Sequence, residues 1–173
     1  NTLQIIDNFY ISNCVDSGVG ILINKSNITI KNTTIRDVNN VGIQVGLNNK
    51  ANYVTLDNCR IINIDYDGIV TQENSFTNGA ERFTIKNSII DSAGKKPTDK
   101  NPGLRYTHGI YAKAAYVTIE NNIFKNVFCS VGGNAISIRN VGTVRNNFIY
   151  NTTRAGISYN TSYPSGSGYL TIE

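Results

Sequence analysis

A repeated pattern of about two dozen residues constrains the fold of this chain more than any other feature. Short segments ending in asparagine recur, as in NITIKN, YVTLDN and YVTIEN, and their last residues are Asn8, Asn32, Asn58, Asn87, Asn121 and Asn146. The spacings between them are 24, 26, 29, 34 and 25 residues, and Ile or Phe follows each asparagine three positions later. Each unit then closes on GI or a variant, as in GIQV, GIVT and GIYA. Such a period is typical of a solenoid built from stacked repeats.

The apolar residues within one unit alternate, as in Val54 and Leu56 or Val117 and Ile119. This is the period of a half-buried strand, so we expect three short strands in each unit. One unit cannot bury its apolar face alone, but stacking pairs every strand with the equivalent strand of the next unit. The sequence therefore predicts an all-β fold, a parallel β-helix of about six to seven coils that forms a single domain over residues 1–173.

The recurring asparagine has a structural explanation. Asparagine tolerates the left-handed backbone conformation that a sharp corner between two strands requires. Its amide can also hydrogen-bond the equivalent amide one coil away. We therefore expect a buried Asn ladder, and we expect Cys14 to be a core thiol in the same inward column as Val38 and Ile64.

Composition and charge limit the partners. The chain has 16 Lys and Arg against 12 Asp and Glu, a net charge of +4 that favours anionic partners. The basic residues are not gathered in a recognised nucleic-acid motif, so we expect no nucleic acid, and no apolar run approaches the roughly 18 residues of a membrane span. The three cysteines are too few and too far apart for a disulfide framework or a CxxC metal site.

The two ends of the sequence both fall inside a repeat. The chain starts within a strand and stops at YLTIE, a seventh unit, just before its expected asparagine. Stacked repeats need protection at their open ends. We therefore expect that this is a fragment of a longer chain and that further coils, a cap, flanking domains or an oligomeric partner cover the ends.

The segments HGIYAKAAYVTIENNIFKNV and GNAISIRNVGTVRNNFIYNTTRAGISY resemble the right-handed parallel β-helix repeat of the pectate-lyase-like superfamily. The resemblance covers essentially the whole chain, and it implies a secreted or cell-surface protein. Members include polysaccharide lyases, uronate epimerases, glycoside hydrolases and phage tailspikes. Their substrate sites lie on the outer face of the sheet that the GI strands form. By position, the residues facing outward there are Leu22, Gln44, Val70, Tyr111, Ser137 and Ser158.

The longest departure from the repeat lies beside this outward row. Between Ala93 and His108 the chain inserts GKKPTDKNPGLRYT, a loop with four cations that leads directly into His108 and Tyr111. We expect the loop, these two residues and polar side chains of the adjacent coils to converge on one binding site. Its expected substrate-binding residues are Lys95, Lys96, Tyr106, Asn134, Ser137 and Arg139.

An acidic polysaccharide is the substrate that such a groove would suit. Uronate β-elimination needs a cation to neutralise the carboxylate, a base for the C5 proton and an acid for the leaving oxygen. We expect His108 to be the base or acid, Arg105 and Arg139 to clamp the carboxylate, and Tyr111 to stack or donate a proton. A lysine of lowered pKa could also move the proton, and epimerisation shares the first step.

Several alternatives stay open. The His108 imidazole, at the start of a strand, could simply hydrogen-bond a turn, the tyrosines could shield the sheet, and the loop lysines could be merely solvated. Asp65, Asp67 and Glu73 could supply oxygen ligands for calcium, which is common in the superfamily, although IDYDG lacks a full ligand set. The whole chain could also be a non-catalytic rod of an adhesin, tailspike or surface protein, because the repeat is shared by enzymes and structural proteins.

Overall fold

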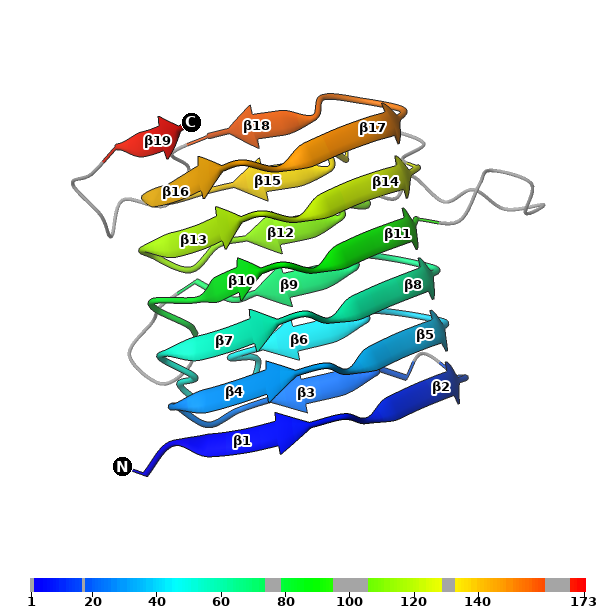
Figure 1. The fold of residues 1–173 in the computed structure, drawn as a ribbon, viewed down its shortest axis with the longest axis vertical. Coiled ribbons are helices and arrows are strands. Elements are labelled where there is room, and N and C mark those ends of the chain that lie inside the picture. Colours follow the sequence, from blue (N-terminus) through cyan, green and yellow to red (C-terminus); the bar gives the residue numbers. More distant parts are fainter. Residues whose placement is uncertain (1, 17, 74–78, 95–105, 129–132, 161–168) are drawn as a thin grey trace.

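The chain winds into a parallel β-helix with three sheets along its length (Figure 1). The structure is a computed structural model, and it describes residues 2–16, 18–73, 79–94, 106–128, 133–160 and 169–173. Sheet A consists of β1 (Gln4–Asp7), β4 (Ile28–Lys31), β7 (Val54–Asp57), β10 (Thr84–Lys86), β13 (Val117–Glu120), β16 (Gly142–Arg145) and β19 (Leu170–Ile172).

Among the described residues, the other two sheets each contain six strands. Sheet B consists of β2 (Tyr10–Cys14), β5 (Thr34–Val38), β8 (Arg60–Ile64), β11 (Ile89–Ala93), β14 (Ile123–Val127) and β17 (Phe148–Thr152). Sheet C consists of β3 (Ile21–Ile23), β6 (Ile43–Val45), β9 (Ile69–Thr71), β12 (Ile110–Ala112), β15 (Ile136–Ile138) and β18 (Ile157–Tyr159). The described residues include no helix long and apolar enough to cross a membrane.

Every strand pairs in parallel with its equivalent one coil away, as the repeat predicts. Ile30 pairs with Leu56, Leu56 with Ile85 and Ile85 with Ile119, although these residues are 26 to 34 positions apart in the sequence. The expected number of six to seven coils needs a correction. The asparagine of the repeat occurs once in each turn of the β-helix, and six such asparagines are separated by five full turns. The structure therefore has about five turns.

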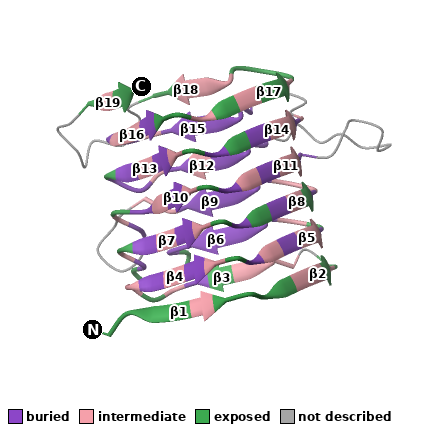
Figure 2. Ribbon diagram, in the orientation of Figure 1, coloured by how far each residue is buried: buried purple, intermediate pink, exposed green. Residues whose placement is uncertain are grey.

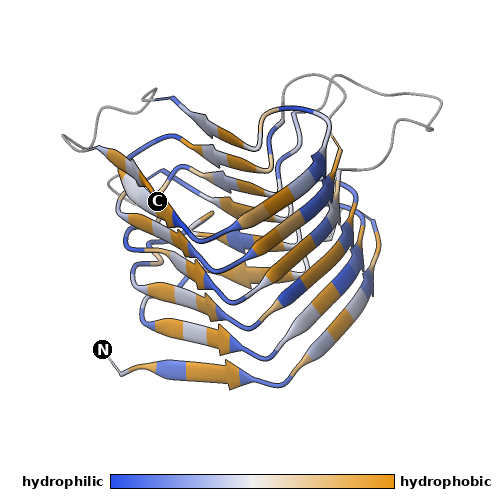
Figure 3. Cartoon of the chain, turned by 45° about the horizontal axis from the view of Figure 1, so that its top comes forward, coloured by the Kyte–Doolittle hydropathy of each residue, from blue (hydrophilic) through white to orange (hydrophobic). Residues whose placement is uncertain are grey.

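The core is a continuous apolar column inside the coils (Figure 2). Alternate residues of each strand supply it, and Figure 3 shows hydrophobic stretches stacked from coil to coil in all three sheets. Ile43, Ile69, Ile110 and Ile136 are fully buried on the inner side of sheet C. Each such side chain contributes about 2 kcal/mol relative to an exposed one, so the column accounts for much of the folding energy.

The expected corner conformation is confirmed. All six asparagines of the repeat have left-handed φ angles between 50° and 61°. The amide of Asn58 donates to Oδ1 of Asn32 at 2.7 Å, as a ladder requires, whereas the amide of Asn87 donates to Oδ1 of Asp57 at 2.8 Å. The expected burial is wrong, because these side chains are exposed. A residue in this conformation turns its side chain outward, and the next residue turns inward.

The buried ladder therefore lies one position later in each coil. Thr33, Cys59, Ser88 and Asn122 are each about 1 % exposed. The Cys59 N–H donates to Oγ of Ser88 at 3.0 Å, and the Ser88 N–H donates to Oδ1 of Asn122 at 2.9 Å. Asn147 continues the series, since its Oδ1 accepts the N–H of Asn122 at 3.0 Å. These side chains satisfy backbone donors that the corner would otherwise bury without partners.

Two of the three cysteines can be placed. Cys14 pairs with Val38, which pairs with Ile64, so Cys14 lies in the expected inward column, although it is only half-buried in the first coil. Cys59 is a buried free thiol whose pKa is raised by burial. Cys129 lies outside the described residues. Both described thiols thus act as packing residues.

The first and last described coils expose apolar side chains at their strands. Ile5 and Phe9 are 58 % and 55 % exposed near one end, and Phe148 and Ile172 are 62 % and 57 % exposed near the other. The protection of these ends by further coils, a cap or a partner remains a prediction.

Candidate functional site

The outward row of sheet C follows the predicted register. Strand pairing makes its residues consecutive neighbours from coil to coil, in the order Leu22, Gln44, Val70, Tyr111, Ser137 and Ser158. Gln44, Val70 and Ser137 are nonetheless buried. Val70 does not belong to the continuous core cluster, consistent with its place on the other side of the sheet.

Two further rows flank this one. The row that follows the strands lies two positions on and faces the same way, because side chains alternate across a strand. Backbone hydrogen bonds from Gly68 to the carbonyl of His108, and from Gly109 to that of Asn134, align the row that precedes the strands. That row contains Asp67, His108 and Asn134, and the row that follows the strands contains Gln72, Lys113 and Arg139. The contacts of Tyr111 with His108, Lys113 and Arg139 bring these rows together on one face.

His108 lies at the centre of the preceding row and is only 2 % exposed. Its Nδ1 accepts the backbone N–H of Asn134 at 3.0 Å, which assigns the proton of the neutral ring to Nε2. Burial, and then repulsion by Arg139, lower the pKa of His108 to about 4. The imidazole is therefore neutral at physiological pH, and it hydrogen-bonds a turn, as the simpler alternative for this residue expected.

Asp67 is the preceding neighbour of His108 and is also buried. Its Oδ1 accepts the backbone N–H of His108 at 2.6 Å. Burial raises the pKa of Asp67 to about 7, against the opposing effects of that hydrogen bond and of the positive charge on Lys113. The carboxyl is therefore only partly ionised at neutral pH, and it links the two coils.

Tyr111 contacts residues of both flanking rows. Its ring stacks on the His108 imidazole with centroids 4.6 Å apart and an interplanar angle of 27°. Lys113 Nζ lies 4.9 Å and Arg139 Cζ 5.3 Å from the centroid of the same ring. Two cations thus contact one tyrosine from neighbouring coils, an attractive arrangement for each cation and a concentration of positive charge for a ligand.

Lys113 has an unusual environment for a lysine. Its ammonium donates to Oε1 of Gln72 at 3.2 Å. Its pKa is lowered, first by burial and also by Arg139, while Asp67 and Glu73 act in the opposite direction. A lysine held in this way can lose its proton more readily than one in water, so it is suited to accept and return a proton.

Several polar atoms on this face have no protein partner. Oγ of Ser137, Nε of Arg139 and Nε2 of Gln44 are buried without a hydrogen bond. Buried polar groups are normally satisfied, so these atoms can serve a bound ligand or water. All three lie in the outward or following rows.

The structure describes two of the other predicted site residues, Tyr106 and Asn134, and leaves three undescribed. Tyr106 is 63 % exposed, and Asn134 contributes its backbone N–H to His108. Lys95, Lys96 and Arg105 lie outside the described residues, so their predicted roles stay predictions.

The expected calcium ligands do not gather. Within the described ranges, no three His, Cys, Asp or Glu side chains are placed to hold a metal ion. Asp67 is turned to the backbone of His108, while Asp65 and Glu73 are half-buried at either end of the same coil segment. The geometry therefore gives Asp67 a structural hydrogen bond rather than a place in a cation site.

Gln72 and Lys113 are the residues that sequence reasoning missed. The signal was present, because each stands two positions after an outward residue and must face the same way. The expected site included Arg139 from the row that follows the strands, but its neighbours Gln72 and Lys113 on the preceding coils were overlooked.

Comparison with known proteins decides the family. A family model described as the right-handed β-helix region matches residues 2–97, which is more than half of the chain. The chain belongs to the right-handed β-helix family. No curated protein and no solved structure gives a match. In this right-handed β-helix most of the candidate site, from His108 to Arg139, follows the matched segment, so its chemistry must be argued from its own residues.

Proposed function

We propose that the outer face of sheet C binds an acidic polysaccharide and acts on its uronate residues, as a lyase or an epimerase. One observation carries the proposal: Lys113 and Arg139 both contact the ring of Tyr111, and Lys113 has a lowered pKa. A uronate carboxylate supplies the negative charge that two neighbouring cations attract. Resemblance to the pectate-lyase-like superfamily and the placement on its usual face support the same substrate class and a secreted or cell-surface location.

Arg139, Lys113 and Tyr111 each have one role in the proposed reaction. Arg139 neutralises the uronate carboxylate, which makes the C5 proton more acidic. Lys113, in its neutral form, takes that proton, and the electron pair left on C5 forms the C4–C5 double bond while the C4–O bond breaks. The Tyr111 hydroxyl gives its proton to the departing oxygen. In an epimerase the leaving bond stays intact and a proton returns to C5 from the opposite face.

His108 is a positioning residue for Tyr111 in this scheme. Its neutral ring stacks on Tyr111 and fixes the tyrosine on the face. With a pKa of about 4 it is a weak base at neutral pH, so the role first expected for His108 passes to Lys113.

The test uses pectate, alginate and a glycosaminoglycan as substrates. A lyase gives an unsaturated product that absorbs in the ultraviolet, and an epimerase exchanges the C5 proton with deuterated solvent, which NMR detects. Lys113→Gln and Tyr111→Phe are expected to abolish turnover, and Arg139→Gln to weaken binding most. Lys25→Gln, at an exposed lysine away from this face, is the matched control. Retained turnover in Lys113→Gln would refute the proposed base.

A structural rod is the second candidate. The hydrogen bonds of Asp67 and His108 favour it, because each side chain accepts a backbone N–H of a neighbouring coil, as the side chains of the inner ladder do. A parent protein that neither binds nor converts any of the three polymers would support the rod and contradict the catalytic proposal.

A further inference from the structure

A row of bulky residues occupies the corner that precedes sheet A. Elsewhere in the described coils, the left-handed positions other than glycine are filled by Asn, Asp and Ser. Before sheet A, left-handed φ angles of 57°, 57° and 56° occur at Tyr53, Arg82 and Tyr116. This conformation costs a bulky L-residue about 1–2 kcal/mol, and asparagine less. Asn27, in the same row with φ of 60°, shows that asparagine fits there.

The tyrosines of this row recur at every second coil. Strand register aligns Tyr53 with Arg82 and Arg82 with Tyr116, just before the paired strands β7, β10 and β13. It likewise aligns Tyr116 with Val141 and Tyr169, ahead of β13, β16 and β19. Two strand spacings separate successive tyrosines by about 10 Å. This is close to the length of one disaccharide in an extended β-1,4-linked glycan.

The three rings are accessible to a ligand. Tyr53, Tyr116 and Tyr169 are 56 %, 51 % and 91 % exposed. Arg82 lies between the first two, with Cζ 5.6 Å from the ring centroid of Tyr53 and 5.2 Å from that of Tyr116. These cation–π contacts hold both rings at the corner. The strained backbone and the exposed aromatic surface together point to recognition, because strain of this kind persists where it is used.

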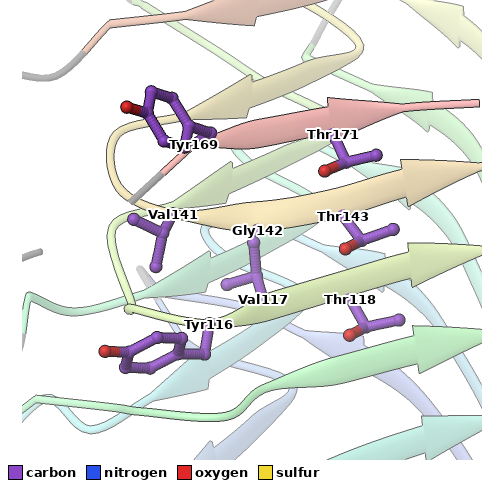
Figure 4. Close-up of a pocket in the computed structure, with 8 residues that line it drawn as sticks. All are labelled: Tyr116, Val117, Thr118, Val141, Gly142, Thr143, Tyr169 and Thr171. Atoms are coloured by element: carbon purple, nitrogen blue, oxygen red, sulfur yellow. The ribbon is translucent and has the colours of Figure 1, made fainter. Parts of the chain in front are cut away.

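A row of hydroxyl groups runs beside the rings. The outward residues of six consecutive sheet A strands are threonines, namely Thr29, Thr55, Thr84, Thr118, Thr143 and Thr171. Figure 4 shows the last three in line beside Tyr116 and Tyr169. There they line a shallow pocket of about 280 Å³, which Val141 and Gly142 also line. Each hydroxyl can donate and accept a hydrogen bond, as sugar hydroxyls require.

The charges next to the threonines cancel. The next outward row alternates in sign from coil to coil, and ion pairs join Lys31 to Asp7, Lys86 to Asp57 and Arg145 to Glu120. Paired charges of this kind leave little net field, so they do not select an anionic ligand. Apart from Arg82, whose guanidinium lies against Tyr53 and Tyr116, the surface is therefore suited to a neutral polymer, in contrast to the cationic face of sheet C.

We infer that Tyr53, Tyr116, Tyr169 and the adjoining threonine row form a second binding site, the tyrosine strip, for a neutral, extended β-1,4-linked polysaccharide. Every second sugar ring packs its C–H face on a tyrosine, and hydroxyl groups of the sugars bond to the threonines. The strip lies on sheet A, and it stands independently of the function proposed for sheet C.

The first experiment measures how affinity depends on ligand length. Isothermal titration calorimetry with cello-oligosaccharides of increasing length should show affinity rising until about five sugars span the roughly 19 Å from Tyr53 to Tyr169, and then levelling off. Maltohexaose, in which α-1,4 links curve the chain, should bind much more weakly than cellohexaose. No binding of cellohexaose, or equal binding of the two hexaoses, would overturn the inference.

The second experiment separates binding from folding. Tyr116→Asn should lower cellohexaose affinity about tenfold. Its thermal stability should equal or exceed that of the parent, because asparagine adopts the left-handed conformation of this corner with less strain. Tyr150→Thr, at an exposed tyrosine of sheet B, is the matched control and should bind as the parent does. Tyr111→Phe should also leave this binding unchanged, which keeps the test separate from that of sheet C. Parent-like binding by Tyr116→Asn, or a marked loss of its stability, would contradict the strip.

Discussion

Replacing Asp67 with asparagine should stabilise the protein in a strongly pH-dependent way. The carboxyl ionises near 3.8 in an unfolded chain and near 7 in the folded protein, where burial penalises its charge. Between these values the folded state keeps a proton that the unfolded state has released. The contribution of Asp67 to the parent's stability therefore falls as pH rises from about 4 to about 7, and the fall levels off above that range.

The size of the effect follows from the two pKa values. At 1.36 kcal/mol for each pKa unit, ionised Asp67 lowers the free energy of unfolding by about 4 kcal/mol at pH 8. Asparagine cannot ionise, and its Oδ1 can still accept the N–H of His108. Asp67→Asn should therefore match the parent below about pH 4 and exceed it by up to about 4 kcal/mol above pH 7. His108 titrates in both proteins, so its contribution cancels from the difference.

Urea unfolding at pH 4, 6 and 8 measures the difference directly. Asp37→Asn is a matched control of opposite sign, because hydrogen bonds from Asn63 and Arg36 lower the pKa of Asp37. That variant should lose stability at neutral pH and lose less in acid. A constant difference between Asp67→Asn and the parent across the pH range, or a less stable variant at pH 8, would refute the assigned burial of charge.

Two further predictions concern the corners. Asn122→Ala should lower the free energy of unfolding in urea by about 2–4 kcal/mol, because it leaves the Ser88 N–H without its acceptor and removes donors to Ile85 and Asn147. Asn121→Ala should lower it less, and the reverse order would place the ladder at Asn121. Gly94→Ala should lower the midpoint of thermal unfolding severely, because φ is 78° there and a Cβ would lie 1.9 Å from the carbonyl oxygen of Phe128; a change within about 0.5 kcal/mol would contradict this packing.

The fold was predictable because local and long-range signals agree in this sequence. Alternating apolar residues define strands, the asparagines mark the corners, and the spacing from Asn32 to Asn58 indicates which strands become neighbours. The buried ladder was misplaced by one residue. Sequence shows which residue tolerates a left-handed corner, but the direction of its side chain depends on the backbone path, which sends Asn121 outward and Asn122 inward.

The site was predictable in register but not in chemistry. Strand alternation correctly placed Tyr111 beside Ser137. It could not show that His108 is buried and neutral, because the lowered pKa depends on burial in the folded chain and on the charge of Arg139 from the next coil. Charge state is set by desolvation and by neighbouring charges in three dimensions, and residue order carries neither.

The nitrogen NMR spectrum of the imidazole is the most direct test of the account, because the chain contains a single histidine. The central claim is that three successive coils bring Asp67, His108 and Asn134 into one hydrogen-bonded row. In protein labelled with ¹⁵N at histidine, it predicts a neutral ring protonated at Nε2, with Nδ1 as acceptor and a midpoint near pH 4. A ring protonated at Nδ1, or one that titrates near 6.5 like an exposed histidine, would contradict the stacking on which the sheet C site depends.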